Sequence, residues 1–156
     1  MEFRKLHINS PVYGKSLDIS SVPDELFSSK ILGDGIAFDP DNGVIYSPVD
    51  GQVASLFPTK HGIGILSKEG IEILIHIGVD TLHLKGQGFN YLVYENQPVK
   101  AGDKLMEFDL EYIKQNAKSH IISMLLTNMD MIHSILPSYG ITSPSCTALE
   151  IEINNP

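Results

Sequence analysis

Short runs of β-branched and other apolar residues, separated by turn signals, are the dominant pattern along this chain. Clusters rich in Gly, Pro, Asn and Asp, such as LGDG, DPDNG, SPVDG and NQPVKAGD, lie between the runs. Short strands at this spacing are typical of an all-β protein, and we expect an antiparallel β-sandwich or barrel. The predicted strands cover residues 44–46, 52–57, 63–66, 71–77, 104–108, 121–126 and 148–153.

A few short helical turns interrupt this pattern. Residues 24–27 follow Pro23 and can form a single turn, and Asp109 can cap a helix with Leu110, Ile113 and Ala117 on one face. The segment NMDMIHSIL predicts a further turn before Pro137. Because no linker, charge block or repeat divides the chain, we expect residues 1–156 to form one domain.

Composition and charge narrow the possible partners. The chain is 42% hydrophobic and carries a formal net charge of -8, so it lacks the basic surface that nucleic acids require. An acidic field of this kind suits a basic protein partner. Cys146 is the only cysteine, which excludes an internal disulfide. The N-terminal residues contain no apolar signal segment, and the longest apolar run is too short to cross a bilayer, so a cytoplasmic protein is expected.

The stretch KHGIGILSKEGIEILIHIGVD, residues 60–80, reads as a β-hairpin with one histidine near each end. If SKEG forms its loop, Leu66 faces Ile71 and His61 lies directly opposite His76. Facing Cβ atoms are about 5 Å apart, so the two imidazoles can touch or share a ligand. This register places Ile63 on the histidine face, and a bulge would shift every such assignment.

Two facing imidazoles in apolar surroundings suit two kinds of chemistry. One is phosphoryl transfer through a phosphohistidine, in which the second imidazole donates to the phosphoryl oxygens. The other is zinc binding, with Asp80 as a third ligand, as in a barrel-sandwich hydrolase. The downstream H-x-H motif of such hydrolases is absent, because His120 and His133 stand alone. A regulatory binding module is a third interpretation, and a structurally paired couple of histidines is the simplest one.

Several long motifs occur together and in order: LGDGIAFDP, SPVDGQV, FPTKHGIGI, IHIGVDTLHLKGQGF, VKAGDKLMEFDL and TNMD. With these motifs the chain closely resembles the glucose-type IIA phosphocarrier domains of the bacterial phosphoenolpyruvate-dependent sugar phosphotransferase system. The resemblance runs from about residue 8 to residue 153. It implies a β-sandwich or barrel of the barrel-sandwich hybrid type, also called the duplicated hybrid motif.

The resemblance also implies roles for individual residues. His76 would be the phosphorylated nucleophile, reacting through Nε2, and His61 would contact the phosphoryl group. Thr59 would orient His61, and Asp34 and Asp80 would be the acidic residues that flank the site. A partner-docking ring of apolar residues would include Ile36, Phe38, Val44, Phe57 and Ile63.

The partners implied by the resemblance are the small carrier protein HPr, as phosphoryl donor, and the cysteine of a IIB domain, as acceptor. No IIB or IIC sequence accompanies the motifs, so association with the membrane-bound IIC is expected to be indirect. Neither a cofactor nor a metal is required, although zinc could bind adventitiously at the histidine pair, and a monomer is expected. Gly62, His83 and Gln87 differ from the residues that are common at these positions in the family. The motifs do not indicate which sugar is transported.

Overall fold

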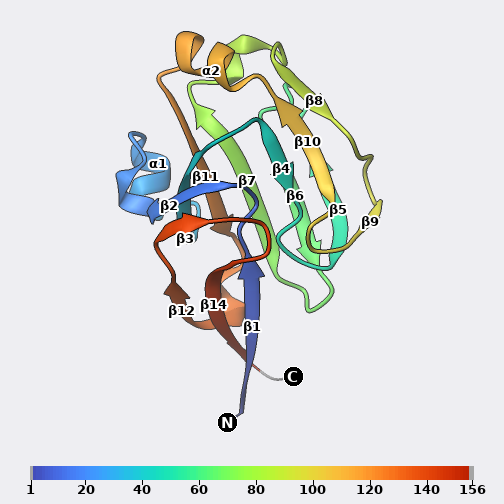
Figure 1. Ribbon diagram of the computed structural model, residues 1–156. Coiled ribbons are helices and arrows are strands. Elements are labelled where there is room, and N and C mark those ends of the chain that lie inside the picture. Colours follow the sequence, from blue (N-terminus) through green and yellow to red (C-terminus); the bar gives the residue numbers. More distant parts are fainter. Residues whose placement is uncertain (1, 155–156) are drawn as a thin grey trace.

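Antiparallel strands make up nearly all of the regular structure in the computed structural model, which describes residues 2–154 (Figure 1). The strands are β1 (Phe3–Asn9), β2 (Gly14–Asp18), β3 (Asp34–Pro40), β4 (Val44–Tyr46), β5 (Gly51–Leu56), β6 (Gly62–Ser67), β7 (Glu72–Val79), β8 (Phe89–Tyr91), β9 (Pro98–Val99), β10 (Lys104–Phe108), β11 (Ser119–Leu126), β12 (Ile132–Pro137), β13 (Gly140–Thr142) and β14 (Thr147–Asn154). The helices are α1 (Glu25–Ser28) and α2 (Leu110–Asn116), with 3₁₀ turns at Ile19–Ser21, Leu82–Leu84 and Met129–Met131. The predicted all-β sandwich is confirmed.

The strands form one large sheet and two small ones. The large sheet has eight strands in the order β13-β2-β3-β11-β7-β6-β5-β9, and the small sheets are β1-β14-β12 and β4-β10-β8. The first and last strands, β1 and β14, pair with each other at one end of the molecule (Figure 1). In the large sheet β7 is an interior strand, with β11 on one side and β6 on the other.

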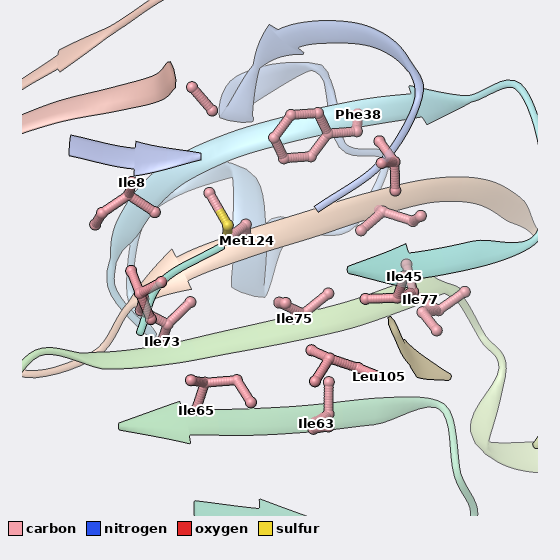
Figure 2. Close-up of a cluster of buried hydrophobic side chains, with 14 of the residues drawn as sticks. Ile8, Phe38, Ile45, Ile63, Ile65, Ile73, Ile75, Ile77, Leu105 and Met124 are labelled. Carbon is pink, nitrogen blue, oxygen red and sulfur yellow. The ribbon is translucent and has the colours of Figure 1, made fainter. Parts of the chain in front are cut away.

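The hydrophobic core is shared by all three sheets. Apolar side chains that alternate along β6 and β7 point into it, and they meet residues from β1, β4 and β10 (Figure 2). Burying such side chains stabilises the fold by about 1.5–3 kcal/mol each before the cost of ordering is subtracted. The central members labelled in the figure include Ile8, Ile45, Ile63, Ile65, Ile73, Ile75, Ile77 and Leu105.

A second, smaller apolar cluster covers the opposite face of the large sheet. It joins Ile19, Val22 and Phe27, on the segment between β2 and β3, to Ala37, Val79 and Leu125 of the sheet. Asp24 caps α1 by accepting a hydrogen bond from the Leu26 backbone N–H. This short helix is therefore fixed at its start by its cap and beneath by the packing of Phe27.

The predicted elements compare with the structure in three ways. The strands predicted at 44–46 and 104–108 match β4 and β10, and the others differ by one or two residues at their ends. The Asp109 cap of α2 is confirmed, since its carboxylate accepts from the Tyr112 backbone N–H. In the segment 128–136 only a 3₁₀ turn forms, and β12 follows it.

None of the helices in residues 2–154 is long and apolar enough to span a bilayer.

The predicted register of the histidine hairpin is wrong by one residue. β6 and β7 pair with Gly62 opposite His76 and Ile63 opposite Ile75. The loop contains three residues, 68–70, because Ser67 N–H donates to the Ile71 carbonyl and Gly70 adopts a left-handed φ of 94°. A three-residue loop with glycine in this position is a common hairpin closure. Its consequence is that Ile63 faces the core and Gly62 shares a face with His76.

Candidate functional site

The two histidines nevertheless lie in contact. The ring centroids of His61 and His76 are 4.9 Å apart at an interplanar angle of 77°, an edge-to-face arrangement. His61 immediately precedes β6 and follows Lys60, whose φ of 62° is left-handed. Because His61 lies in this turn, its side chain does not follow the alternation of the strand. The predicted contact is therefore present, although the register that suggested it is not.

Small residues surround His76 on its own face of the sheet. Its Cα partners are Gly62 on β6 and Ser123 on β11, and Ser123 is paired in turn with Ala37 on β3. The Phe27 ring of α1 packs on this face, with its centroid 4.8 Å from that of His76. His76 is left half-buried between Phe27 and His61. No local pattern predicts the role of Phe27, because it belongs to a separate element on the side of the large sheet that faces away from the main core.

The main chain fixes the proton of His76. Nδ1 lies 3.0 Å from the carbonyl oxygen of Gly78. A carbonyl oxygen can only accept, so Nδ1 carries the hydrogen and the lone pair of the neutral ring is on Nε2. Gly78 reaches this position with a φ of 76°, and a Cβ built there would lie 2.8 Å from the Ser119 carbonyl oxygen. Glycine is therefore required for the turn that orients the His76 ring.

Burial keeps His76 neutral. It lowers the pKa of His76 from 6.5 to about 4, with a further contribution from the neighbouring His61. The hydrogen bond to Gly78 and the charge of Asp24 oppose this shift without cancelling it. Removing an imidazolium from water costs more than these contacts return. At neutral pH the ring therefore presents an unprotonated nucleophilic nitrogen.

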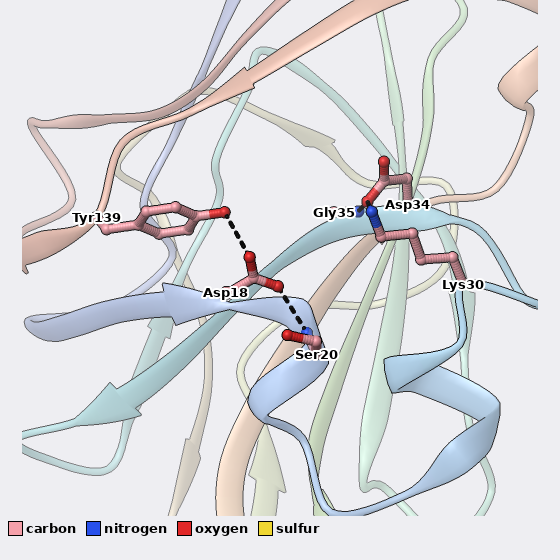
Figure 3. A network of polar contacts seen from close by, with 6 residues as sticks. All are labelled: Asp18, Ser20, Lys30, Asp34, Gly35 and Tyr139. Carbon is pink, nitrogen blue, oxygen red and sulfur yellow. Dashed lines mark hydrogen bonds and ion pairs between the residues drawn. The ribbon is translucent and has the colours of Figure 1, made fainter.

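Asp24 is the carboxylate whose charge acts on His76, whereas the family motifs predict Asp34 and Asp80 as the acidic residues that flank the site. Asp24 reaches the site because it caps α1, the helix that also carries Phe27. Asp34 instead forms an ion pair with Lys30 at 3.6 Å and accepts from the Gly35 backbone N–H (Figure 3). In the same view Tyr139 donates to Asp18, and this network lies beside α1. The acidic neighbour predicted from the GDG turn is thus paired with a lysine.

His61 is held by the side chains of its own loop. Its Nδ1 is 2.7 Å from the Thr59 hydroxyl, and its ring packs edge-on against Phe57 at 5.3 Å between centroids. Only 7% of His61 is exposed. Burial lowers the pKa of His61 below 6.5, and a hydrogen bond to the Thr59 backbone opposes that shift. The predicted neighbours Thr59 and His61 therefore do lie in contact.

Asp80 lies where β7 ends. It is exposed and left-handed, with a φ of 58°, and it comes two residues after Gly78. Next to it, the buried Thr81 hydroxyl donates to the Ile77 carbonyl and ties the turn to the strand. Asp80 is thus exposed four residues after His76, and its predicted place beside the site stays a prediction.

The predicted docking ring is only partly exposed. Ile36, Phe38 and Ile63 have no exposed surface and belong to the core, so the prediction that they meet a partner is wrong. Val44 and Phe57 are half-buried, so part of each side chain is accessible to a partner protein. Exposed apolar side chains lie instead on α1 and the segment after it, which we call the α1 rim: Leu26, Ile31 and Leu32.

The zinc alternative finds no support in the arrangement of side chains. Within residues 2–154, no three His, Cys, Asp or Glu side chains are grouped closely enough to hold a metal ion. The pair formed by His61 and His76 therefore has no third ligand, and the hydrolase interpretation loses its metal centre.

Comparisons with known proteins point to one family. Residues 6–132 match the family model described as phosphoenolpyruvate-dependent sugar phosphotransferase system, EIIA 1. A glucose-specific EIIA component from Bacillus anthracis is 49% identical over 136 residues, covering 87% of this chain and 82% of that protein. A glucose-specific EIICBA component from Staphylococcus carnosus is 49% identical over 79% of this chain, which corresponds to 18% of that longer protein. The solved glucose permease IIA from Mycoplasma capricolum superimposes with a TM-score of 0.89 and 35% identity, covering 96% of this chain and 99% of that one.

Proposed function

The chain belongs to the EIIA 1 family of the phosphoenolpyruvate-dependent sugar phosphotransferase system, and we propose that His76 is the residue through which it carries a phosphoryl group. In this proposal His76 accepts the group from phospho-HPr and passes it to the cysteine of a IIB domain. One observation carries the assignment: the Gly78 carbonyl holds the proton on Nδ1 and leaves the lone pair on Nε2.

Acceptance requires little from the protein beyond positioning. The Nε2 lone pair attacks phosphorus in line as the bond from phosphorus to the donor imidazole breaks, and the donor ring takes the electron pair. The Nδ1 proton stays on His76, where the Gly78 carbonyl stabilises the positive charge that the ring gains. Phosphoryl transfer has a loose transition state, so orientation and electrostatics supply most of the catalysis.

Onward transfer depends on His61. The cysteine thiolate attacks phosphorus, the bond to Nε2 breaks, and its electron pair returns to the His76 ring. If the Thr59 hydroxyl donates to Nδ1 of His61, Nε2 of that ring carries a proton. We propose that this N–H donates a hydrogen bond to the oxygens of a phosphoryl group on His76, because the centroids of the two rings are only 4.9 Å apart.

The charges around the site favour passage of the group over its retention. The Asp24 carboxylate acts on His76, and it repels a bound phosphoryl group. Asp80 would add to this repulsion from the edge of the site. We propose that the α1 rim, with Phe57 and Val44, supplies the apolar contact to partners. The net charge of -8 would steer a basic HPr toward it.

In this proposal residues 1–156 act as a single cytoplasmic EIIA domain and a monomer. Its contact with the membrane-bound IIC component is indirect, through IIB. No cofactor takes part, because both reactions exchange a phosphoryl group between protein nucleophiles.

The first experiment is an intact-mass measurement after incubation with phosphoenolpyruvate, enzyme I and HPr. We expect the wild-type chain to gain one acid-labile phosphoryl group and His76→Ala to gain none. His120→Ala is the matched control, since His120 pairs with Asp39 on another part of the large sheet and should be phosphorylated normally. Full phosphorylation of His76→Ala would show that the nucleophile is another residue.

A further inference from the structure

The hydroxyl of Tyr91 lies between two main-chain segments at the end of the β5–β6 hairpin. It accepts a hydrogen bond from the Phe57 backbone N–H at 2.9 Å, and it is near both the Phe57 and the Gly62 carbonyl oxygens. A hydroxyl has only one hydrogen to donate. The contact to Gly62 is the shorter of the two, so Tyr91 accepts from Phe57 and donates to Gly62.

This hydroxyl takes the place of a sheet hydrogen bond. The last regular pair of β5 and β6 is Leu56 with Ile63, and the next pair would be Phe57 with Gly62. On the other side, Ile77 N–H donates to the His61 carbonyl, so the Gly62 carbonyl points away from β7. It therefore faces Phe57, and the Tyr91 hydroxyl completes the link between the two strands.

The segment closed in this way carries the second histidine. Residues 57–62 form a turn in which Lys60 N–H donates to the Phe57 carbonyl at 2.9 Å, and Thr59 and His61 lie within it. Tyr91 itself comes from β8 and pairs with Met106 in a different sheet, which anchors the ring. Burial raises the pKa of Tyr91 to about 12, so the hydroxyl keeps its hydrogen throughout the neutral range. One side chain thus fixes both ends of the loop that presents His61.

We propose that Tyr91 is a positioning residue for His61, and that it acts on onward transfer without acting on acceptance. The inference rests on the proposed phosphoryl relay. His76 is oriented by the Gly78 carbonyl of its own strand, a hydrogen bond in which Tyr91 takes no part, so loss of the Tyr91 hydroxyl leaves His76 in place. It frees the ends of the 57–62 loop, and with them the angle at which His61 meets the phosphoryl group.

The test separates the two half-reactions in Tyr91→Phe, which keeps the ring and removes only the oxygen. Single-turnover rates would be measured for phosphorylation by phospho-HPr and for transfer to a IIB domain. We expect acceptance within about twofold of wild type and transfer slowed by about tenfold, the effect of one lost hydrogen bond in a positioned site. Tyr94→Phe is the matched control, because Tyr94 is 67% exposed, and both rates should be unchanged.

A double variant distinguishes positioning from general loosening of the fold. If Tyr91 acts through His61, adding Tyr91→Phe to His61→Ala should cause no further loss of transfer, since residues acting as a unit are not additive. A second tenfold loss in that background would overturn the inference. Equal slowing of both half-reactions in Tyr91→Phe alone would overturn it as well.

A spectroscopic readout keeps the inference testable without the relay. In the unphosphorylated protein, we expect Tyr91→Phe to shift the ¹⁵N resonances of the His61 ring and to leave those of His76 unchanged. Unchanged His61 resonances would refute the positioning role. If wild type and Tyr94→Phe both failed to accept a phosphoryl group, the relay would be wrong, and the resonances would still decide the role of Tyr91.

Discussion

The two histidines of the site are held by different means. His76 lies within β7, between β6 and β11, and its ring is oriented by the main-chain carbonyl of Gly78. His61 lies in a loop, and its ring is oriented by the side chains of Thr59 and Phe57. His76, the proposed nucleophile, is therefore part of the sheet, whereas the orientation of His61 depends on side-chain contacts that substitution can remove. Because the two rings are held separately, we expect substitutions to separate acceptance of the phosphoryl group from its onward transfer.

Removing the His61 side chain should have the largest effect on the difference between the two half-reactions. We expect His61→Ala to accept a phosphoryl group from HPr but to transfer it to a IIB domain about 10²–10³-fold more slowly, the typical cost of losing one donor to a developing charge. Rapid-quench measurement of both half-reactions would show this. His133→Ala is a suitable control, because His133 stacks on Phe3 in another sheet. Transfer at the wild-type rate would mean that His61 has no part in the second step.

The converse test disturbs the main chain at Gly78, whose carbonyl oxygen orients the His76 ring. In Gly78→Ala the new Cβ would lie 2.6 Å from Thr81 Cγ2 and 2.8 Å from the Ser119 carbonyl oxygen, at a φ of 76°. We expect the free energy of unfolding to fall by about 3 kcal/mol, from left-handed strain and overpacking together. Acceptance from HPr should slow, because the carbonyl that orients His76 must move. Urea denaturation and single-turnover phosphorylation would measure the two effects.

Gly102→Ala is the matched control for this variant. Gly102 has a similar left-handed φ of 93°, but no atom lies within 4 Å of a Cβ built there. It should show the backbone strain alone, about 1–2 kcal/mol, with normal phosphorylation. If Gly78→Ala cost no more than Gly102→Ala and accepted phosphoryl normally, the Gly78 carbonyl would not be needed to orient the ring.

The same contrast explains which parts of the molecule the sequence could predict. Strands such as β4 and β10 follow from local patterns of apolar residues and turns, and the cap at Asp109 follows from local side-chain chemistry. The hairpin register does not, because SKEG can close a loop of three residues as well as one of four. One residue of difference moved Ile63 from the expected outer face into the core.

Local sequence patterns do not predict the residues that lie beside His76 but are distant from it in the sequence. Asp24 and Phe27 are about fifty positions from His76 and reach it only because α1 packs on the outer face of the sheet. The strand pairing that brings Ser123 beside His76 is equally non-local. Family motifs indicate the histidine pair and Thr59, whereas the flanking roles of Asp34 and Asp80 stay predictions, and Asp34 forms an ion pair with Lys30. Motifs thus locate the chemistry of the site, and packing decides which charges surround it.

The smallest expected effect concerns acid, and it tests whether the sheet really keeps His76 neutral. The pKa of His76 is lowered from 6.5 to about 4, so between these values the unfolded chain binds a proton that the folded chain does not. The contribution of the neutral His76 to the free energy of unfolding is then fully present above pH 6.5 and is lost as the pH falls toward 4. From pH 7 to pH 5 this contributes a loss of about 2 kcal/mol in the free energy of unfolding. Urea denaturation of wild type and His76→Gln at both pH values would isolate it, since His61 and the carboxylates titrate in both proteins. If the two proteins lost the same stability, the His76 ring would be solvated rather than buried, and its neutrality at pH 7 would owe nothing to the sheet.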